Sequence, residues 1–213
     1  MMDLFIVGAG SVGGFLAYHA NEMGQYSIRG FLDDDVTKHG ENFYDIPVLG
    51  GLDFVSNINT KFAVAIAVAD PLSKQDILNK LKKNQFVTFP SFIHPSSWIG
   101  AKVLINEGCI IYPGVIINFE TVINSFSTVN MNSNIGHNCF LGEFSTLSPG
   151  VNLGGFTTIG ESSFMGIGAS TIQGINIGNN SIIGAMSVVI KNVNDNSKVV
   201  GNPAKEIFHK SNK

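Results

Sequence analysis

The sequence predicts two domains of different fold class, an α/β domain over residues 1–92 and an all-β parallel helix of hexapeptide repeats over residues 93–213. Three observations lead to this prediction. Short aliphatic segments alternate with helical stretches over the first 90 residues, and an apolar residue recurs at every sixth position from residue 99 onward. The composition, 44% hydrophobic and 14% charged, is that of compact globular domains.

The first part of the chain has the strand–helix–strand order of a parallel sheet. A glycine-rich turn between the first strand and the first helix lies at the carboxyl end of the strand, where open α/β sheets bind ligands. Pro71 marks the start of the second helix, since proline fits the first helical turn. The expected strands are residues 4–7, 27–32 and 63–68, and the expected helices end at Met23 and near Lys83.

The second part follows a period of six, which fits neither an α-helix nor a hairpin sheet. Fifteen of the sixteen positions from Ile99 to Val189 are apolar, where composition alone gives about seven, and Thr171 is the exception. The residue after each aliphatic is usually Gly or Asn, the types that best tolerate the dihedrals of tight turns. This pattern is typical of a β-solenoid in which three short strands make one coil and the aliphatic column points inward.

Bulk properties exclude several classes of function. A net charge of -3 and a pI near 5.9 give no basic surface for nucleic acid. The longest aliphatic run, residues 63–69, is too short to span a bilayer, and the start lacks the pattern of a secretory signal. Cys109 and Cys139 have no zinc-like spacing partner, so we expect no metal and two reduced thiols in a cytoplasmic protein.

The glycine-rich turn allows an alternative function. Gly8, Gly10 and Gly13, with Asp33 twenty residues later, superficially match a dinucleotide-binding fingerprint, as in an NAD-dependent oxidoreductase. The α/β part stops near residue 90, about one mononucleotide-binding half, and the solenoid leaves no room for a dehydrogenase substrate domain. These features argue against NAD. A non-catalytic ice-binding or scaffold solenoid is also disfavoured, because its regular outward threonine ladder is missing.

One histidine lies in residues 134–150, NIGHNCFLGEFSTLSPG, among small residues and isolated aliphatics. An imidazole, with an unperturbed pKa of about 6.5, can accept a proton at neutral pH. A solenoid coil would hold His137 rigidly, as a general base requires. By itself, however, a lone histidine is more often structural. Cys139 falls in a column of small residues, which favours packing over nucleophilic chemistry.

The chain as a whole resembles the hexapeptide acyltransferases that combine a small Rossmann-like N-terminal domain with a left-handed β-helix and assemble as trimers. The group includes bacterial nucleotide-sugar N-acetyltransferases and sialic acid O-acetyltransferase-like proteins. The resemblance rests on the glycine turn and on four segments in order: FLDD, IHPSSWIG, GHNCFLGEFSTLSPG and VVGNPAKEI. No segment is specific alone, whereas their order and spacing are.

The resemblance implies that His137 is the general base, deprotonating a sugar amine or hydroxyl as it attacks an acyl-CoA thioester. Many relatives carry an acid directly after this histidine, where the chain has Asn138, which can orient the imidazole but supplies no charge. Glu143 is the candidate for the missing carboxylate, with a solvated turn residue as its alternative interpretation. A second histidine that relatives place nine positions later is here Thr146.

The resemblance also implies two binding sites. The nucleotide-sugar would be held at the glycine turn, where residues without side chains let backbone amides approach a pyrophosphate. Acetyl-CoA, the expected co-substrate, would lie along the coils between the subunits of a homotrimer. The implied nucleotide-sugar residues are Gly13, Gly14, Asp33, Asp34 and Ala69, and the implied acetyl-CoA residues are Thr146, Ile167 and Ala185.

We therefore expect an N-acetyltransferase that acetylates a nucleotide-linked 4-amino-4,6-dideoxy sugar for O-antigen, lipopolysaccharide or other bacterial surface glycans. A sialic acid O-acetyltransferase is the alternative within the same class. A hydroxyl depends more on a strong base than an amine does, so the missing acid beside His137 favours the amine. The sequence does not specify the nucleotide, the sugar or the length of the acyl group.

Overall fold

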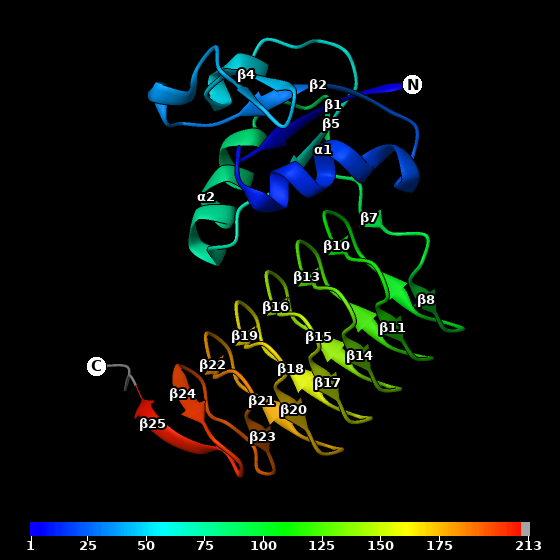
Figure 1. The fold of residues 1–213 in the computed structure, drawn as a ribbon, viewed down its shortest axis with the longest axis vertical. Helices are drawn as coiled ribbons and strands as arrows, with labels where there is room; N and C mark the ends of the chain where they lie inside the picture. Colours follow the sequence, from blue (N-terminus) through cyan, green and yellow to red (C-terminus); the bar gives the residue numbers. More distant parts are fainter. Residues whose placement is uncertain (210–213) are drawn as a thin grey trace. The chain divides into compact units, whose positions relative to one another are not determined.

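The computed structural model describes residues 1–209, and the last four residues of the expected C-terminal tail lie outside them. Contacts divide the chain into two compact units, Met1–Phe92 and Ile93–Lys213. No helix among the described residues is long and apolar enough to cross a lipid bilayer. Each unit is built around its own β-structure (Figure 1).

The N-terminal unit is a six-stranded sheet with the order β3-β4-β2-β1-β5-β6. Strand β1 is central and runs parallel to both β2 and β5, while β3 is antiparallel to β4. The chain first moves from β1 to β2 on one side and later to β5 on the other, so β1 and β5 flank a topological switch point. The strands are β1 (Met2–Val7), β2 (Tyr26–Leu32), β3 (Asn42–Phe43), β4 (Ile46–Gly50), β5 (Phe62–Ile66) and β6 (Val87–Thr88).

Two α-helices and two short 3-10 helices complete this unit. Helix α1 (Ser11–Met23) follows the glycine turn, and α2 (Pro71–Leu81) starts with a proline behind the N-cap Asp70, whose carboxylate accepts from the Ser73 amide. The 3-10 helices are η1 (Val36–Lys38) and η2 (Leu52–Val55). The predicted strands and helices are confirmed, with the third strand ending two residues earlier than expected, at Ile66.

The second unit is a parallel β-helix whose strands stack coil upon coil in three sheets (Figure 1). Ile116 pairs with Asn134 and Asn134 with Asn152, so one coil is eighteen residues, or three hexads. The two-residue strands, which start with β7 (Phe92–Ile93) at the unit boundary, are β8 (Trp98–Ile99), β9 (Leu104–Ile105), β10 (Ile110–Ile111), β11 (Ile116–Ile117), β12 (Val122–Ile123), β13 (Thr128–Val129), β14 (Asn134–Ile135), β15 (Phe140–Leu141), β16 (Thr146–Leu147), β17 (Asn152–Leu153), β18 (Thr158–Ile159), β19 (Phe164–Met165), β20 (Ser170–Thr171), β21 (Asn176–Ile177), β22 (Ile182–Ile183) and β23 (Val188–Val189). A longer hairpin of β24 (Ser197–Val200) and β25 (Lys205–His209) follows.

The predicted inward column is confirmed. Each of its members is the second residue of a two-residue strand, and all from Ile111 to Val189 are buried. Thr171 keeps its place because its hydroxyl accepts from the Gly154 amide at 3.1 Å and contacts the Thr157 hydroxyl at 3.0 Å. The one polar member of the column is therefore satisfied inside the core.

The corners of the coils correct one expectation. The turn residues with positive φ are not those directly after the inward aliphatics but those two positions further on, at every sixth residue from Lys102 to Met186. The glycines after the aliphatics serve a different purpose, because a Cβ on Gly136 would lie 2.6 Å from the backbone nitrogen of Gly155 in the next coil. They allow neighbouring coils to approach closely.

A column of small residues links successive coils by side chain. The hydroxyls of Thr121, Ser127 and Ser133 each donate to a backbone carbonyl fifteen residues later, at 2.9, 2.9 and 3.1 Å. The thiol of Cys139 makes the same contact with the Gly154 carbonyl at 3.4 Å. Cys139 is thus a buried packing residue, as expected, and burial raises the pKa of its thiol.

Candidate active site

His137 is fixed by rings and backbone from the coils on both sides. Its imidazole stacks on Phe119, one coil earlier, with 5.3 Å between centroids and 9° between planes, and meets Phe156 edge-on at 4.9 Å. On the other side lies Gly155, where a Cβ would be only 2.7 Å from Nε2. The aromatic stack and the missing side chain together leave a slot shaped for the imidazole.

A chain of hydrogen bonds runs from His137 through three corner residues. His137 Nδ1 lies 2.9 Å from Asn138 Oδ1, and Asn138 Nδ2 donates to Glu120 Oε2 at 3.0 Å. The other oxygen of Glu120 accepts from Lys102 Nζ at 3.1 Å. The hydrogen bond from Asn138, then the hydrogen bond and charge of Lys102, lower the pKa of Glu120, so the carboxylate is ionised at neutral pH.

The spacing of this chain follows from the fold. Lys102, Glu120 and Asn138 are eighteen residues apart, and all three have positive φ, from 54 to 58°. They therefore occupy the same corner of three successive coils, where their side chains reach one another. Within residues 1–209, no hydrogen bond engages Nε2 of His137, the nitrogen opposite the one that Asn138 contacts.

The remaining solenoid residues predicted for catalysis lie apart from this chain. Glu143 is exposed, and among the described residues it forms neither a hydrogen bond nor an ion pair with His137 or Asn138. The carboxylate that reaches the imidazole through Asn138 is that of Glu120. Thr146 lies partly exposed on the outward side of β16, and Ile167 and Ala185 are exposed at equivalent places of adjacent coils.

The predicted nucleotide residues gather at the carboxyl edge of the N-terminal sheet. A pocket of about 190 Å³ opens there, lined by Val7, Gly8, Leu32, Asp33, Asp34, Leu52, Val68 and Ile77. Asp33 follows β2 and Val68 follows β5, on either side of β1, as the switch-point topology requires. Ala69 is exposed and directly follows the pocket residue Val68 in the sequence, but it does not line the pocket itself.

The two aspartates differ in how far their carboxylates are already engaged. Asp33 accepts from the amides of Ala9 and Asp35 at 3.1 and 3.0 Å and from Lys38 Nζ at 2.8 Å. Burial alone raises its pKa, but these hydrogen bonds and the Lys38 charge outweigh it and lower the pKa below the usual range. Asp34, 61% exposed, accepts from the Leu52 amide at 3.2 Å through one oxygen, and its other oxygen lies 3.8 Å from Lys80 Nζ, so it makes fewer and longer contacts than Asp33.

Gly13 and Gly14 are buried and serve helix packing. A Cβ on Gly13 would collide with the Gly8 carbonyl, and one on Gly14 would lie 2.6 Å from the Tyr44 ring. Gly10, where a Cβ would meet nothing within 4 Å, is the open glycine of the turn. As the N-cap of α1 it supplies no side-chain hydrogen bond, so the amides of the first helical turn have no side-chain partner from the cap.

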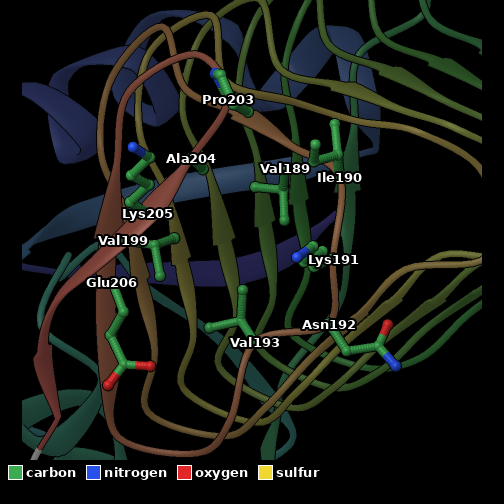
Figure 2. Close-up of a pocket in the computed structure, with 10 residues that line it drawn as sticks. All are labelled: Val189, Ile190, Lys191, Asn192, Val193, Val199, Pro203, Ala204, Lys205 and Glu206. Carbon is green, nitrogen blue, oxygen red and sulfur yellow. The ribbon is translucent and has the colours of Figure 1, made fainter.

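The C-terminal end of the solenoid contains a second, larger cavity of about 370 Å³ (Figure 2). Val189, Val193 and Val199 give it an apolar wall, and Lys191, Lys205 and Glu206 supply its charged groups. None of the residues predicted for catalysis or binding lines it. It lies between the last coil and the β24–β25 hairpin.

Sequence reasoning missed five residues of the His137 site: Lys102, Phe119, Glu120, Gly155 and Phe156. Phe119 and Gly155 are eighteen residues from His137, Glu120 and Phe156 are eighteen residues from Asn138, and Lys102 is eighteen residues before Glu120, which is the length of a coil. A search at that spacing, down and up the coils, would have found them.

A β-helix of hexads with an imidazole fixed between its coils, joined to a small α/β unit, defines a class of protein: the hexapeptide-repeat acyltransferases. Similarity to known proteins supports this class. Residues 3–81 match the family model of the PglD N-terminal domain. The fold is the left-handed β-helix of the hexapeptide acyltransferases, and the structure is similar over nearly its whole length to those of nucleotide-sugar N-acetyltransferases. No curated protein sequence matches it.

Several solved structures cover nearly the whole chain. The acetyltransferase domain of PglB from Neisseria gonorrhoeae is 28% identical, with a TM-score of 0.88 over 97% of this chain and 100% of that one. A mutant of perosamine N-acetyltransferase from Caulobacter crescentus, in complex with CoA and GDP-perosamine, is 25% identical, with a TM-score of 0.88 over 98% of each chain. WeeI from Acinetobacter baumannii is 26% identical, with a TM-score of 0.85 over 97% of this chain and 100% of that one.

Proposed function

We propose that this acyltransferase transfers an acetyl group from acetyl-CoA to the amino group of a nucleotide-linked 4-amino-4,6-dideoxy sugar. The observation that carries the proposal is His137, held between Phe119 and Gly155 with its Nδ1 hydrogen-bonded to Asn138 and its Nε2 without a hydrogen bond to any described residue. Similarity to the Caulobacter crescentus enzyme, whose structure contains CoA and GDP-perosamine, supports both substrates. Similarity to the PglB acetyltransferase domain, also solved with acetyl coenzyme A, supports the donor.

In this reaction Nε2 of His137 takes the proton as the sugar nitrogen attacks the thioester carbonyl carbon. The new N–C bond forms first, and backbone amides stabilise the negative oxygen of the tetrahedral intermediate. The C–S bond then breaks, the carbonyl re-forms, and the imidazolium returns its proton to the departing CoA thiolate. An amine needs little beyond alignment and proton removal, which a rigid imidazole provides.

The N-terminal domain, residues 1–92, would bind the nucleotide part of the acceptor. The first turn of α1, which has no side-chain cap, would offer backbone amides to a pyrophosphate. Asp33 and Asp34 line the pocket at the carboxyl edge of the sheet and would accept hydrogen bonds from ribose or base. Asp34 is the better placed of the two, because Asp33 already accepts three hydrogen bonds from the protein. Gly13, Gly14 and Ala69 would shape the turn around the ligand.

Acetyl-CoA would lie along the coils of the β-helix, residues 93–213, against Thr146, Ile167 and Ala185. A neighbouring subunit of a homotrimer would supply the second wall of this binding site. Large apolar side chains on the outside of the solenoid support such an assembly, among them Phe140 at 44%, Phe164 at 41% and Ile167 at 59% exposure. The expected cytoplasmic location and the role in O-antigen or lipopolysaccharide assembly stay predictions.

Release of the CoA thiol from acetyl-CoA tests the function. The acceptors are UDP-, TDP- and GDP-linked 4-amino sugars, with sialic acid alongside, and the variant is His137→Ala. We expect fast release with one amino sugar and a kcat lower by roughly 10²–10⁴-fold in the variant. Turnover of sialic acid with no turnover of any amine would replace the proposal by O-acetylation. Near-full activity of the variant would remove His137 from the mechanism.

A further inference from the structure

We propose that Glu120 is a positioning residue that acts through Asn138 to hold His137 in the tautomer whose Nε2 is free to accept a proton. The proposal rests on the proposed function of His137 as the base. The residue directly after the histidine is Asn138, which has no carboxylate. In this proposal the carboxylate comes from Glu120 in the neighbouring coil, eighteen residues before Asn138. In the described part of the chain, Glu120 forms no hydrogen bond or ion pair with the imidazole; it is connected to it by the Asn138 amide, so it would act on the reaction only through Asn138 and His137.

The first step of the argument is the orientation of the Asn138 amide. An ionised carboxylate can only accept hydrogen bonds, so the Asn138 group that lies 3.0 Å from Glu120 Oε2 must be the NH₂. The opposite end of the amide, Oδ1, then faces His137 Nδ1 at 2.9 Å. Glu120 therefore decides which end of the amide the imidazole meets.

The second step is the tautomer of His137. A carbonyl oxygen is only an acceptor, so Nδ1 must carry the ring proton to bond with Asn138 Oδ1. In a neutral imidazole the other nitrogen, Nε2, is then the acceptor, which is the form that a general base needs. Were the amide reversed, its NH₂ would donate to Nδ1, the proton would move to Nε2, and the ring could not take one from the sugar.

The third step is that Glu120 stays charged. Lys102 Nζ binds its second oxygen at 3.1 Å, and the hydrogen bonds from Asn138 and Lys102 lower the pKa of the Glu120 carboxyl. The ionised carboxylate and the imidazole are thus connected by two hydrogen bonds through the neutral Asn138 amide. The spacing is set by the backbone, since Lys102, Glu120 and Asn138 occupy the same left-handed corner of successive coils.

Kinetics of Glu120→Gln give the first test. Glutamine keeps the size of the side chain but can both donate and accept, so it no longer selects one orientation of the Asn138 amide. We expect kcat to fall about 10-fold, the lower end of the effect of removing the partner that orients a functional histidine. KM for both substrates should change less than twofold, and Glu107→Gln, the same change at another exposed glutamate of the solenoid, should leave kcat unchanged. A kcat of Glu120→Gln within twofold of the parent would overturn the proposal.

The tautomer itself gives a readout that a merely structural role would not move. Histidine-labelled protein is compared by ¹⁵N NMR at about pH 8.5, where imidazoles are neutral, with the His137 signals assigned by their loss in His137→Ala. We expect a protonated Nδ1 and a bare Nε2 in the parent protein, and a shift toward protonated Nε2 in Glu120→Ala. The same tautomer in both proteins would contradict the mechanism.

A charge-relocation pair completes the test. Asn138→Asp places a carboxylate directly on Nδ1 but sets it against Glu120, two like charges at hydrogen-bond distance. Combining Asn138→Asp with Glu120→Gln keeps one carboxylate and moves it next to the histidine. We expect the double variant to recover kcat to within threefold of the parent and to exceed both single variants. A double variant slower than either single one would overturn the proposal.

The outcomes separate the two proposals. If His137→Ala keeps its activity, the proposed function fails, whatever Glu120 does. If His137→Ala is inactive while Glu120→Gln has normal kcat and Glu120→Ala has the tautomer of the parent, the function stands and the role of Glu120 alone is refuted.

Discussion

Gly155→Ala should displace the imidazole of His137 while leaving the histidine itself unchanged. The added Cβ would lie 2.7 Å from Nε2 and 2.9 Å from Cε1, whereas ordinary contact begins at 3.4 Å. The ring must therefore move by 3.4 minus 2.7, or about 0.7 Å, yet it is held by the Phe119 stack behind it and by Asn138 at Nδ1. Because Gly155 has no left-handed φ, alanine adds no backbone strain.

A misplacement of about 1 Å can cost roughly 10²-fold in rate, so we expect Gly155→Ala to lower kcat by about 10–100-fold. The assay is thiol release from acetyl-CoA at saturating acceptor, with thermal unfolding measured in parallel, since overpacking also costs about 1–3 kcal/mol of stability. The control is the double variant with His137→Ala. Without the ring, the added methyl has nothing to displace and should lower kcat no further.

Two results would refute this reasoning. A kcat of Gly155→Ala within twofold of the parent would mean that the imidazole has more room than the distances allow. A further loss of rate when Gly155→Ala is added to His137→Ala would mean that the glycine acts on the active site by a route other than the imidazole.

Three further changes test the fold around the two sites. Thr121→Val removes the hydroxyl that accepts from the buried Cys139 amide at 3.1 Å, and should lower the free energy of unfolding by about 1–3 kcal/mol in urea titrations. Gly14→Ala pushes a methyl into the Tyr44 ring and should cost about 1–3 kcal/mol, seen as a lower Tm. Asp33→Asn should destabilise most at pH 7, because a carboxyl with a lowered folded pKa stabilises the fold above its unfolded pKa of about 4, and this gain is lost as pH falls through the folded pKa. A stability difference between Asp33→Asn and the parent that does not shrink below about pH 4 would contradict the assignment.

The periodic parts of the fold could be predicted because burial is encoded directly in the sequence. One apolar residue in six fixes the inward column, and the rigid spacing leaves little choice of register. The β3–β4 hairpin was not predicted, since its two-residue turn is Tyr44–Asp45, both with positive φ, and lacks the usual Asn-Gly signal. Its strand β3 is also only two residues long.

The candidate site also has one part that could be predicted from the sequence and one part that could not. His137 could be singled out because it is the one imidazole in residues 134–150, a segment made mostly of small, apolar and amide side chains. Its supporting residues could not be found from neighbours in the sequence, because Phe119, Glu120 and Gly155 each lie in another coil. Coil length brings these residues to the same corner, but only side-chain geometry shows that the carboxylate reaches the amide.

The β24–β25 hairpin follows the last coil of the solenoid and interrupts the stacking of coils. Each coil offers its open backbone edge to the next, so a parallel β-helix has no internal reason to stop, and a bare last coil could pair with another molecule. Here β24 pairs parallel with β22, but β25 turns back and pairs antiparallel with β24, which breaks the eighteen-residue repeat. Lys205 and Glu206 place charges of both signs on this last strand. The reversal therefore works as a terminator, protecting the chain from end-to-end polymerisation into fibres.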